Sequence, residues 1–142
     1  MSFMDGFSGY NQIKMTPKDK TKTTFTSEWG IYCYMVMPFG LKNAGAIYRR
    51  MATALLHDMM HNEVEVYVDD MIVKSKDRGS HTIYLRKFFE RIKEYRFRLN
   101  PQKCTFGVTI RKLLSFLVSD KGIEVDPSKI KAILEMPKVR KR

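Results

Sequence analysis

The sequence has little cysteine, few acidic residues and no long apolar run. Its only cysteines, Cys33 and Cys104, lie far apart and lack the close spacings of a disulfide framework or a zinc ladder, so we expect reduced thiols in an intracellular protein. No apolar run approaches the ~20 residues that a membrane-crossing helix requires, and no signal peptide is visible. We therefore expect no membrane partner.

Acidic residues are outnumbered by basic ones. The chain has 15 Asp and Glu against 26 Lys and Arg, a formal net charge of +11. Twelve of the basic residues fall between positions 74 and 112, where the acids are Asp77, Glu90 and Glu94, and four more lie in the C-terminal KVRKR. Such a surplus suits a surface that binds phosphates, which favours nucleic acid as a partner, although a merely soluble basic surface also fits.

Repeats, low-complexity linkers, a P-loop and a serine or cysteine triad are also missing. With 142 residues, 44% of them hydrophobic, the chain suffices for one domain with a core. His57 and His61 in HDMMH approach the HExxH zinc pattern, but Asp58 replaces the glutamate and no third ligand is evident. We interpret both histidines as polar residues at a helix end.

The apolar pattern predicts alternating strands and helices. Helices interleaved with antiparallel hairpins indicate an α+β fold, in which a sheet carries helices on one face. The first expected elements are a strand in SFMDGFSGYNQIKM, broken by Gly6 and Gly9, and a hairpin in 23–37. A helix from an Asn43 cap through Asn62, a hairpin in 64–73, and a helix capped by Ser80 and stopped by Asn100 and Pro101 follow. The last expected elements are strands at KCTFGV and KLLSFLVS and a helix from Asp126 and Pro127 through Leu134.

The hairpin VEVYVDDMIV carries two adjacent aspartates. Its alternation sends the first three valines to one face and Glu65, Tyr67 and Asp69 to the other, so Asp69 leaves the apolar side of the strand. Two close carboxylates repel each other, which calls for a positive charge nearby. An ordinary turn, which Asp commonly forms, explains the pair equally well.

A third carboxylate, Asp5, lies in the first expected strand. If that strand lies beside the 64–73 hairpin, the acids meet across the sheet. Magnesium prefers oxygen ligands, and two such ions ~3.5–4 Å apart can activate an attacking hydroxyl and stabilise a leaving oxygen. Three acids on the sheet of a basic protein therefore predict nucleotidyl transfer.

Five blocks carry a family resemblance: MDGFSGYNQI, MPFGLKNAGAIY, YVDD, LNPQKCTFGV and LLSFLVSDKGIEVDP. Their order and spacing resemble reverse transcriptases of gypsy-class LTR retrotransposons, over nearly the whole chain. The resemblance implies a polymerase palm-type antiparallel sheet with helices packed on one face and a partial fingers hairpin. It implies a single partial domain over 1–142, with palm at 1–15 and 44–118, fingers at 16–43, and the start of the thumb or connection at 119–142.

The resemblance also implies site residues. Asp5, Asp69 and Asp70 would be catalytic and would hold two Mg²⁺ ions, with Mn²⁺ as an alternative. Tyr10 would lie under the sugar and exclude a ribose 2′-hydroxyl; its alternative is a packed core tyrosine. Phe39, Gly40 and Tyr67 would contact the nucleotide. Lys103 would lie near the triphosphate and donate a proton to the leaving pyrophosphate. Leu114, Ser115 and Phe116 would belong to the primer grip. A solvated lysine and a plain hairpin strand are the respective alternatives for Lys103 and the grip segment.

The implied function is RNA-directed DNA polymerisation, which adds deoxynucleotides to a primer 3′-hydroxyl. Implied partners are an RNA or DNA template with primer, deoxynucleoside triphosphates and other parts of a Pol polyprotein, and the implied location is a cytoplasmic virus-like particle.

Two positions depart from the family pattern: Arg49 replaces a glutamine, and Ser115 replaces a glycine where a Cβ could disturb the primer backbone. The chain also begins four residues before Asp5, so we expect the first half of the fingers, most of the thumb and a ribonuclease H domain to be absent and this chain alone to be inactive. The second hypothesis is a non-catalytic retroelement remnant that binds nucleic acid through its basic face.

Overall fold

A computed structural model of the chain describes residues 1–67, 70–113, 116–119 and 122–136. The chain divides into two compact units, Met1–Phe106 and Gly107–Arg142. Each is described by itself below.

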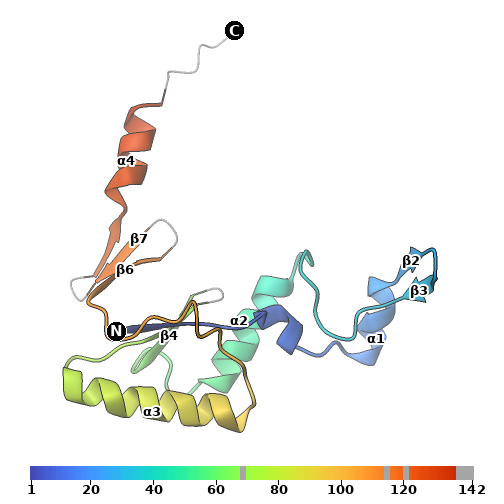
Figure 1. The fold of residues 1–142 in the computed structure, drawn as a ribbon, viewed down its shortest axis with the longest axis horizontal. Coiled ribbons are helices and arrows are strands. Elements are labelled where there is room, and N and C mark those ends of the chain that lie inside the picture. The colour runs from blue at the N-terminus through green and yellow to red at the C-terminus, as the bar shows by residue number, and fades with distance from the viewer. Residues whose placement is uncertain (68–69, 114–115, 120–121, 137–142) are drawn as a thin grey trace. The chain divides into compact units, whose positions relative to one another are not determined.

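The first unit is built on a three-stranded antiparallel sheet of β1 (Ser2–Asp5), β5 (Asp70–Val73) and β4 (Val64–Tyr67), in the order β1-β5-β4 (Figure 1). The hairpin expected in 64–73 is therefore confirmed. The outer edge of β1 is partly paired as well, because Phe3 exchanges backbone hydrogen bonds of 2.7 and 2.9 Å with Thr105.

No strand forms at KCTFGV, so that prediction is wrong. Thr105 makes only an isolated bridge to Phe3, since the chain turns just before it: the N–H groups of Lys103 and Cys104 both donate to the carbonyl of Asn100. Gly107 follows with a φ of 64°, which turns the chain again.

Two helices, α2 (Ala44–Leu55) and α3 (Arg78–Glu94), cover one face of this sheet. The register pairs Met4 with Met71 and Val64 with Val73, and the period of two places all four side chains on that face. They form one buried cluster with side chains from both helices and from the turn after α2: Leu55, Leu56, Met59, Phe88 and Ile92. The expectation of helices on one face of an antiparallel sheet holds for these elements.

Both helices differ from prediction at their ends. α2 stops at Leu55 rather than Asn62, because residues 56–63 form turns that still bury Leu56 and Met59. Asn43 occupies its N-cap position but makes no side-chain capping bond. α3 begins at Arg78, because the carboxylate of Asp77, not Ser80, caps it by accepting the N–H of Ser80 at 2.8 Å.

Between β1 and α2 the chain forms short elements. The first strand ends at Asp5, and η1 (Gly9–Gln12), α1 (Pro17–Lys20) and η2 (Thr21–Thr23) follow. The hairpin expected in 23–37 is present as β2 (Phe25–Ser27) and β3 (Gly30–Tyr32).

The second unit contains an antiparallel sheet, β6 (Ile110–Leu113), β7 (Phe116–Ser119) and β8 (Gly122–Val125), followed by α4 (Pro127–Leu134). KLLSFLVS, expected as one strand, spans parts of β6 and β7, and β8 was not predicted. The start of α4 is as predicted: Asp126 accepts the N–H of Ser128 at 3.0 Å and Pro127 is the first helical residue. The hydrogen bond from Lys112 lowers the pKa of Asp126 to about 2. Among the described residues, no helix has the length and apolar character needed to cross a bilayer.

Candidate active site

Asp5 and Asp70 are directly opposite each other in the β1–β5 pair. Opposite residues of an antiparallel pair project from the same face, with Cβ atoms ~4.5–5.5 Å apart. Their neighbours Met4 and Met71 lie in the core, so both carboxylates belong to the other face of the sheet. The fold thus brings together two of the three predicted catalytic acids; Asp69 lies outside the described residues.

A positive charge lies beside this pair. Lys103 Nζ is 3.8 Å from Asp5 Oδ2. The turn that carries the lysine is anchored on the aspartate itself, because Asn100 donates its N–H to the Asp5 carbonyl at 2.8 Å and accepts that of Lys103 at 3.1 Å. Since the lysine side chain is 65% exposed and the contact is long, this is a weak, solvent-screened ion pair.

A cavity of about 270 Å³ opens beside Asp5. Of the predicted site residues, four line it: Asp5, Tyr10, Phe39 and Lys103. The rest of its wall is the 6–9 segment and Asn100. Asp5 and Tyr10, which are near each other in the sequence, therefore share one cavity with the distant Phe39 and Lys103. The assignment of this cavity to a nucleotide stays a prediction.

Other predicted residues lie around this cavity rather than in its wall. Gly40 has a φ of 91° and lines a neighbouring hollow together with Phe39. Tyr67 is opposite Asp70 in the β4–β5 pair and is exposed. Phe116 begins β7 in the second unit, while Leu114 and Ser115 lie outside the described residues. The primer-grip assignment stays a prediction.

The ring of Tyr10 is held by two aromatic neighbours. It packs edge-on against Phe39, with ring centroids 5.1 Å apart, and against Tyr48, at 5.5 Å. Tyr48 is fully buried, so Tyr10 joins the core on one side and lines the cavity on the other. The core interpretation therefore describes one side of this tyrosine, and its role beside a sugar stays a prediction.

The sequence reasoning missed the part that Gly6, Gly9 and Tyr48 play. A Cβ built on Gly6 would lie 2.7 Å from Tyr48 Oη, and one on Gly9 would lie 2.6 Å from Tyr48 Cε2. The two glycines thus let the cavity wall close onto a buried ring. The available signal was a pair of glycines between an acid and an aromatic residue.

Metal-ligand chemistry at this site rests on the acids of the sheet. Among the described residues, which leave out Asp69, no group of three or more His, Cys, Asp or Glu side chains is placed to hold a metal. Asp5 and Asp70 nevertheless fit magnesium, which prefers carboxylate oxygens and commonly takes only one or two of them. The donor set present therefore agrees with the ion that the resemblance implies.

The histidines of HDMMH lie in turns after α2, each beside a different acid. His57 Nδ1 is 3.8 Å from Asp58, and His61 Nδ1 is 3.1 Å from Glu65. Asp58 in turn accepts two hydrogen bonds from Arg91, at 2.7 and 2.9 Å, which lower its pKa to about 2. This arrangement gives no support to a zinc site.

A family model described as "Reverse transcriptase (RNA-dependent DNA polymerase)" matches residues 1–140. The chain belongs to this family. It is 38% identical over 134 residues to the retrovirus-related Pol polyprotein from transposon opus and 34% identical to that from transposon gypsy, both of Drosophila melanogaster. These matches place it among reverse transcriptase domains of gypsy-class LTR retrotransposons, as the sequence blocks indicated. Each match covers 94% of this chain but only 13% of the polyprotein.

The fold is also that of solved reverse transcriptases. A foamy viral protease-reverse transcriptase in complex with RNA/DNA hybrid matches with a TM-score of 0.79 at 22% identity, covering 98% of this chain and 19% of that one. A second foamy viral structure, in complex with double-stranded DNA, gives a TM-score of 0.82, also at 22% identity, and covers 98% of this chain and 24% of that one. These likenesses confirm the α+β fold class.

Proposed function

We propose that this chain is the palm, with part of the fingers, of an RNA-directed DNA polymerase that adds deoxynucleotides to a primer 3′-hydroxyl. The observation that carries the proposal is the in-register pair Asp5 and Asp70 beside a cavity lined by Tyr10, Phe39 and Lys103. A carboxylate pair that can bind metal ions and a nearby cation are features that nucleotidyl transfer uses.

Each side chain then has a role. Asp5 and Asp70, with Asp69 as the third expected ligand, would hold two Mg²⁺ ions. When bound, these ions supply Lewis acidity toward the attacking hydroxyl and the leaving pyrophosphate. Tyr10 bounds the space beside the sugar and excludes a 2′-hydroxyl. Lys103 balances the charge at Asp5 and donates a proton to the pyrophosphate.

The relatives support the proposed partners. The foamy viral enzymes are in complex with RNA/DNA hybrid and with double-stranded DNA, and the Drosophila relatives are polyproteins. We accordingly propose a primer-template duplex, deoxynucleoside triphosphates and the remaining segments of a Pol polyprotein as partners. The palm assignment covers 1–15 and 44–118, the fingers assignment covers 16–43, and a cytoplasmic virus-like particle is the proposed location.

A second candidate function is nucleic-acid binding without catalysis. It is favoured by the exposed arginines of α2, because Arg49 and Arg50 have no ion-pair partner among the described residues. Both candidates require duplex binding, and only the first requires the acids of the sheet. The two can therefore be separated by removing a carboxylate.

Primer extension on an RNA template tests the proposal. Because the chain spans 13% of its polyprotein relatives, the assay replaces the matching segment of the opus polymerase with these residues. Magnesium-dependent extension is expected, with near-complete loss in Asp70→Asn and Asp69→Asn and unchanged duplex binding. Glu90→Gln, an exposed carboxylate on α3, is the matched control and should extend normally. A chimera that folds and binds duplex but never extends, even with Ser115→Gly and Arg49→Gln, would establish the non-catalytic alternative.

A further inference from the structure

A second hollow lies next to the candidate active site. It has a volume of about 490 Å³ and shares Phe7 and Ser8 with the cavity beside Asp5. Its other walls come from η1 and from the segment that follows α3. None of its lining residues is acidic: Phe7, Ser8, Asn11, Gln12, Tyr95, Arg96, Phe97 and Arg98.

The side chain of Gln12 fixes the two walls to each other. Its Nε2 donates to the carbonyls of Phe7 at 2.7 Å and of Arg98 at 2.9 Å, and its Oε1 accepts the N–H of Arg98 at 2.7 Å. Phe7 also donates its N–H to the Arg98 carbonyl at 3.0 Å. The hollow is therefore a built feature with a hydrogen-bonded frame.

Arg96 occupies a position that usually belongs to glycine. After the end of α3, the N–H of Phe97 donates to the Ile92 carbonyl and the N–H of Arg96 to the Lys93 carbonyl, which is the Schellman pattern. Arg96 is the left-handed residue of that motif, with a φ of 54°. Glycine adopts this conformation without the steric cost that a Cβ brings. An arginine under backbone strain at a hollow points to a use for its side chain.

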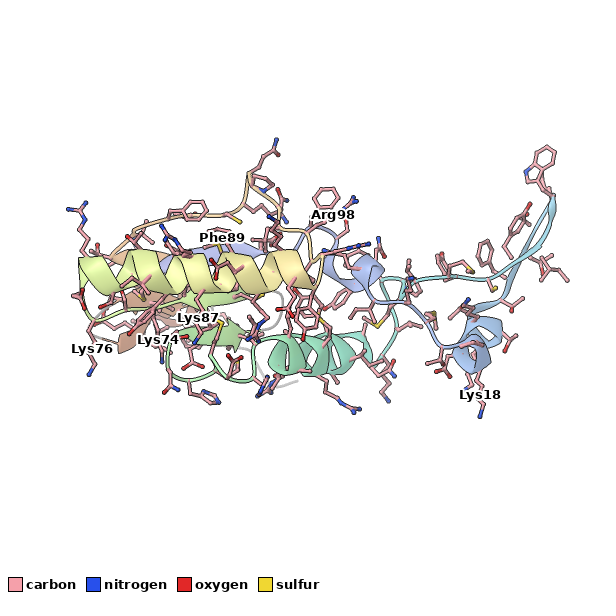
Figure 2. The ribbon with its side chains drawn as sticks, turned by 90° about the horizontal axis from the view of Figure 1, so that it is seen from below. Lys18, Lys74, Lys76, Lys87, Phe89 and Arg98 are labelled. Carbon is pink, nitrogen blue, oxygen red and sulfur yellow. The ribbon has the colours of Figure 1, made fainter. Side chains whose placement is uncertain are left out.

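The two guanidinium groups are available to a ligand. Two cations of the preceding helix α3 are engaged: Arg91 binds Asp58, and Lys87 binds Glu63 at 2.8 Å. The guanidinium groups of Arg96 and Arg98, by contrast, have no hydrogen bond or ion pair within the part of the chain that the structure describes. Figure 2 shows Arg98 at the C-terminal end of α3. Unpaired guanidinium groups match the geometry of phosphate oxygens.

Two exposed rings complete the lining. Phe7 is 53% exposed and Tyr95 is 60% exposed. Flat rings beside guanidinium groups are a common way of binding nucleotides, since bases stack on aromatic side chains while cations hold the phosphates. The volume also lies within the ~300–1,000 Å³ of small-molecule sites.

We propose that this hollow binds a nucleotide unit outside the active site, with its phosphates on Arg96 and Arg98 and its base against Tyr95 or Phe7. A free nucleoside triphosphate and a nucleotide of a single strand present the same chemistry. The proposal stands apart from the catalytic one, because neither Asp5 nor Asp70 lines the hollow.

Fluorescence anisotropy of an ATP analogue carrying a dye on its ribose tests the site, with the full 142-residue chain at low salt and in EDTA. Loss of one charge-assisted contact should weaken binding about tenfold or more, in Arg96→Gly and in Arg98→Ala. Arg96→Gly also relieves the left-handed strain, so its thermal midpoint should be unchanged or higher, which excludes misfolding as the cause. Arg86→Ala, an exposed arginine elsewhere on α3, is the charge-matched control and should bind as the parent chain does.

Competitors identify the source of the ligand. Unlabelled ATP should compete better than tripolyphosphate, which has no base. If a short oligothymidylate displaces the probe, and Arg96→Gly abolishes that displacement, the ligand of the site is a nucleotide of a single strand. If only ATP competes, the ligand is the free nucleotide. Four results would each overturn the proposal. They are absence of ATP binding, a loss of affinity in Arg86→Ala equal to that in the two test variants, competition by tripolyphosphate equal to that by ATP, and loss of ATP binding in Asp70→Asn.

Discussion

The imidazole of His81 is joined through Nε2 to the hydroxyl of Ser2, at 2.7 Å, which ties α3 to the first residue of β1. The other ring nitrogen, Nδ1, is buried and has no hydrogen-bond partner among the described residues. Burial, and secondarily the positive N-terminus, lower the pKa of His81 below its ordinary value of 6.5.

This histidine predicts a pH dependence of folding. A lowered pKa means that the unfolded chain takes up the proton first as pH falls, so stability is retained above about pH 6.5 and is lost progressively below it. The urea midpoint should therefore decrease between pH 7.5 and 5.5. His81→Asn should flatten this dependence, whereas His57→Asn, at an exposed position, should leave it unchanged. An equal slope in all three chains would contradict the assignment.

The contact of Gly9 with Tyr48 predicts an asymmetry between two glycines. Gly9→Ala places a methyl group 2.6 Å from a buried ring carbon and should cost ~1–3 kcal/mol of the free energy of unfolding. Gly45→Ala is the control, because its Cβ meets only Tyr10 Oη at 3.9 Å and its position within α2 favours alanine by ~0.5–1 kcal/mol. Chemical denaturation of both variants measures the difference, and similar midpoints would be inconsistent with the close packing described.

Adjacent phenylalanines on α3 should differ in what they contribute to stability. Phe88 is fully buried in the core cluster, whereas Phe89 is 39% exposed, with its ring centroid 6.3 Å from that of Phe106. Phe88→Ala should cost ~3–5 kcal/mol of unfolding free energy, because it leaves a cavity between α3 and the sheet. Phe89→Ala should cost clearly less. Thermal unfolding of the pair distinguishes them, and a reversed order would show that α3 presents a different face to the sheet.

Tyr10 should control the choice of sugar if the polymerase proposal holds. In the opus chimera, Tyr10→Ala removes the ring that bounds the cavity, so ribonucleotides should be incorporated more readily relative to deoxynucleotides. Tyr34→Ala, at an exposed tyrosine outside that cavity, serves as the control. The ratio of the two incorporation rates is the measurement, and a ratio unaffected by Tyr10→Ala would remove this residue from the sugar site.

The excess of basic residues predicts strong salt dependence of duplex binding. Affinity for a primer-template should fall roughly tenfold or more between ~50 and ~200 mM salt if several phosphates are contacted. A filter-binding titration at four salt concentrations gives the slope. Salt-independent affinity, or no binding at low salt, would count against both functions proposed for the chain.

Local patterns predicted the elements that a single segment determines. The alternation in VEVYVDDMIV identified both the hairpin and its apolar face, because a period of two leaves one choice of orientation. The predicted start of α3 was wrong, because the cap in the structure is Asp77 and not Ser80. Asp77 prevails because its backbone is extended, with φ −132° and ψ 167°, while the hydroxyl of Ser80 only joins the same carboxylate.

Contacts between distant segments could not be predicted in this way. The sequence indicated that Asp5 and the aspartate pair would meet if their strands were neighbours, but the register that pairs Asp5 with Asp70 depends on how β1 and β5 pack. β8 was missed because GIEV is a short segment whose four residues are all exposed, so no buried face marks it. The packing of Tyr48 against Gly6 and Gly9 joins residues about forty positions apart, which no local pattern reports.

The amide of Gln12 does for Arg98 what a neighbouring strand would do, since one side chain satisfies both its N–H and its carbonyl. Together with the N–H of Phe7, which also donates to the Arg98 carbonyl, this side chain fixes η1 to the segment that follows α3. The exit of α3 cannot shift without breaking these bonds or carrying η1, and with it the ring of Tyr10, along. A ligand that shifted the backbone at Arg96 and Arg98 would therefore also shift η1, and with it the wall of the cavity beside Asp5.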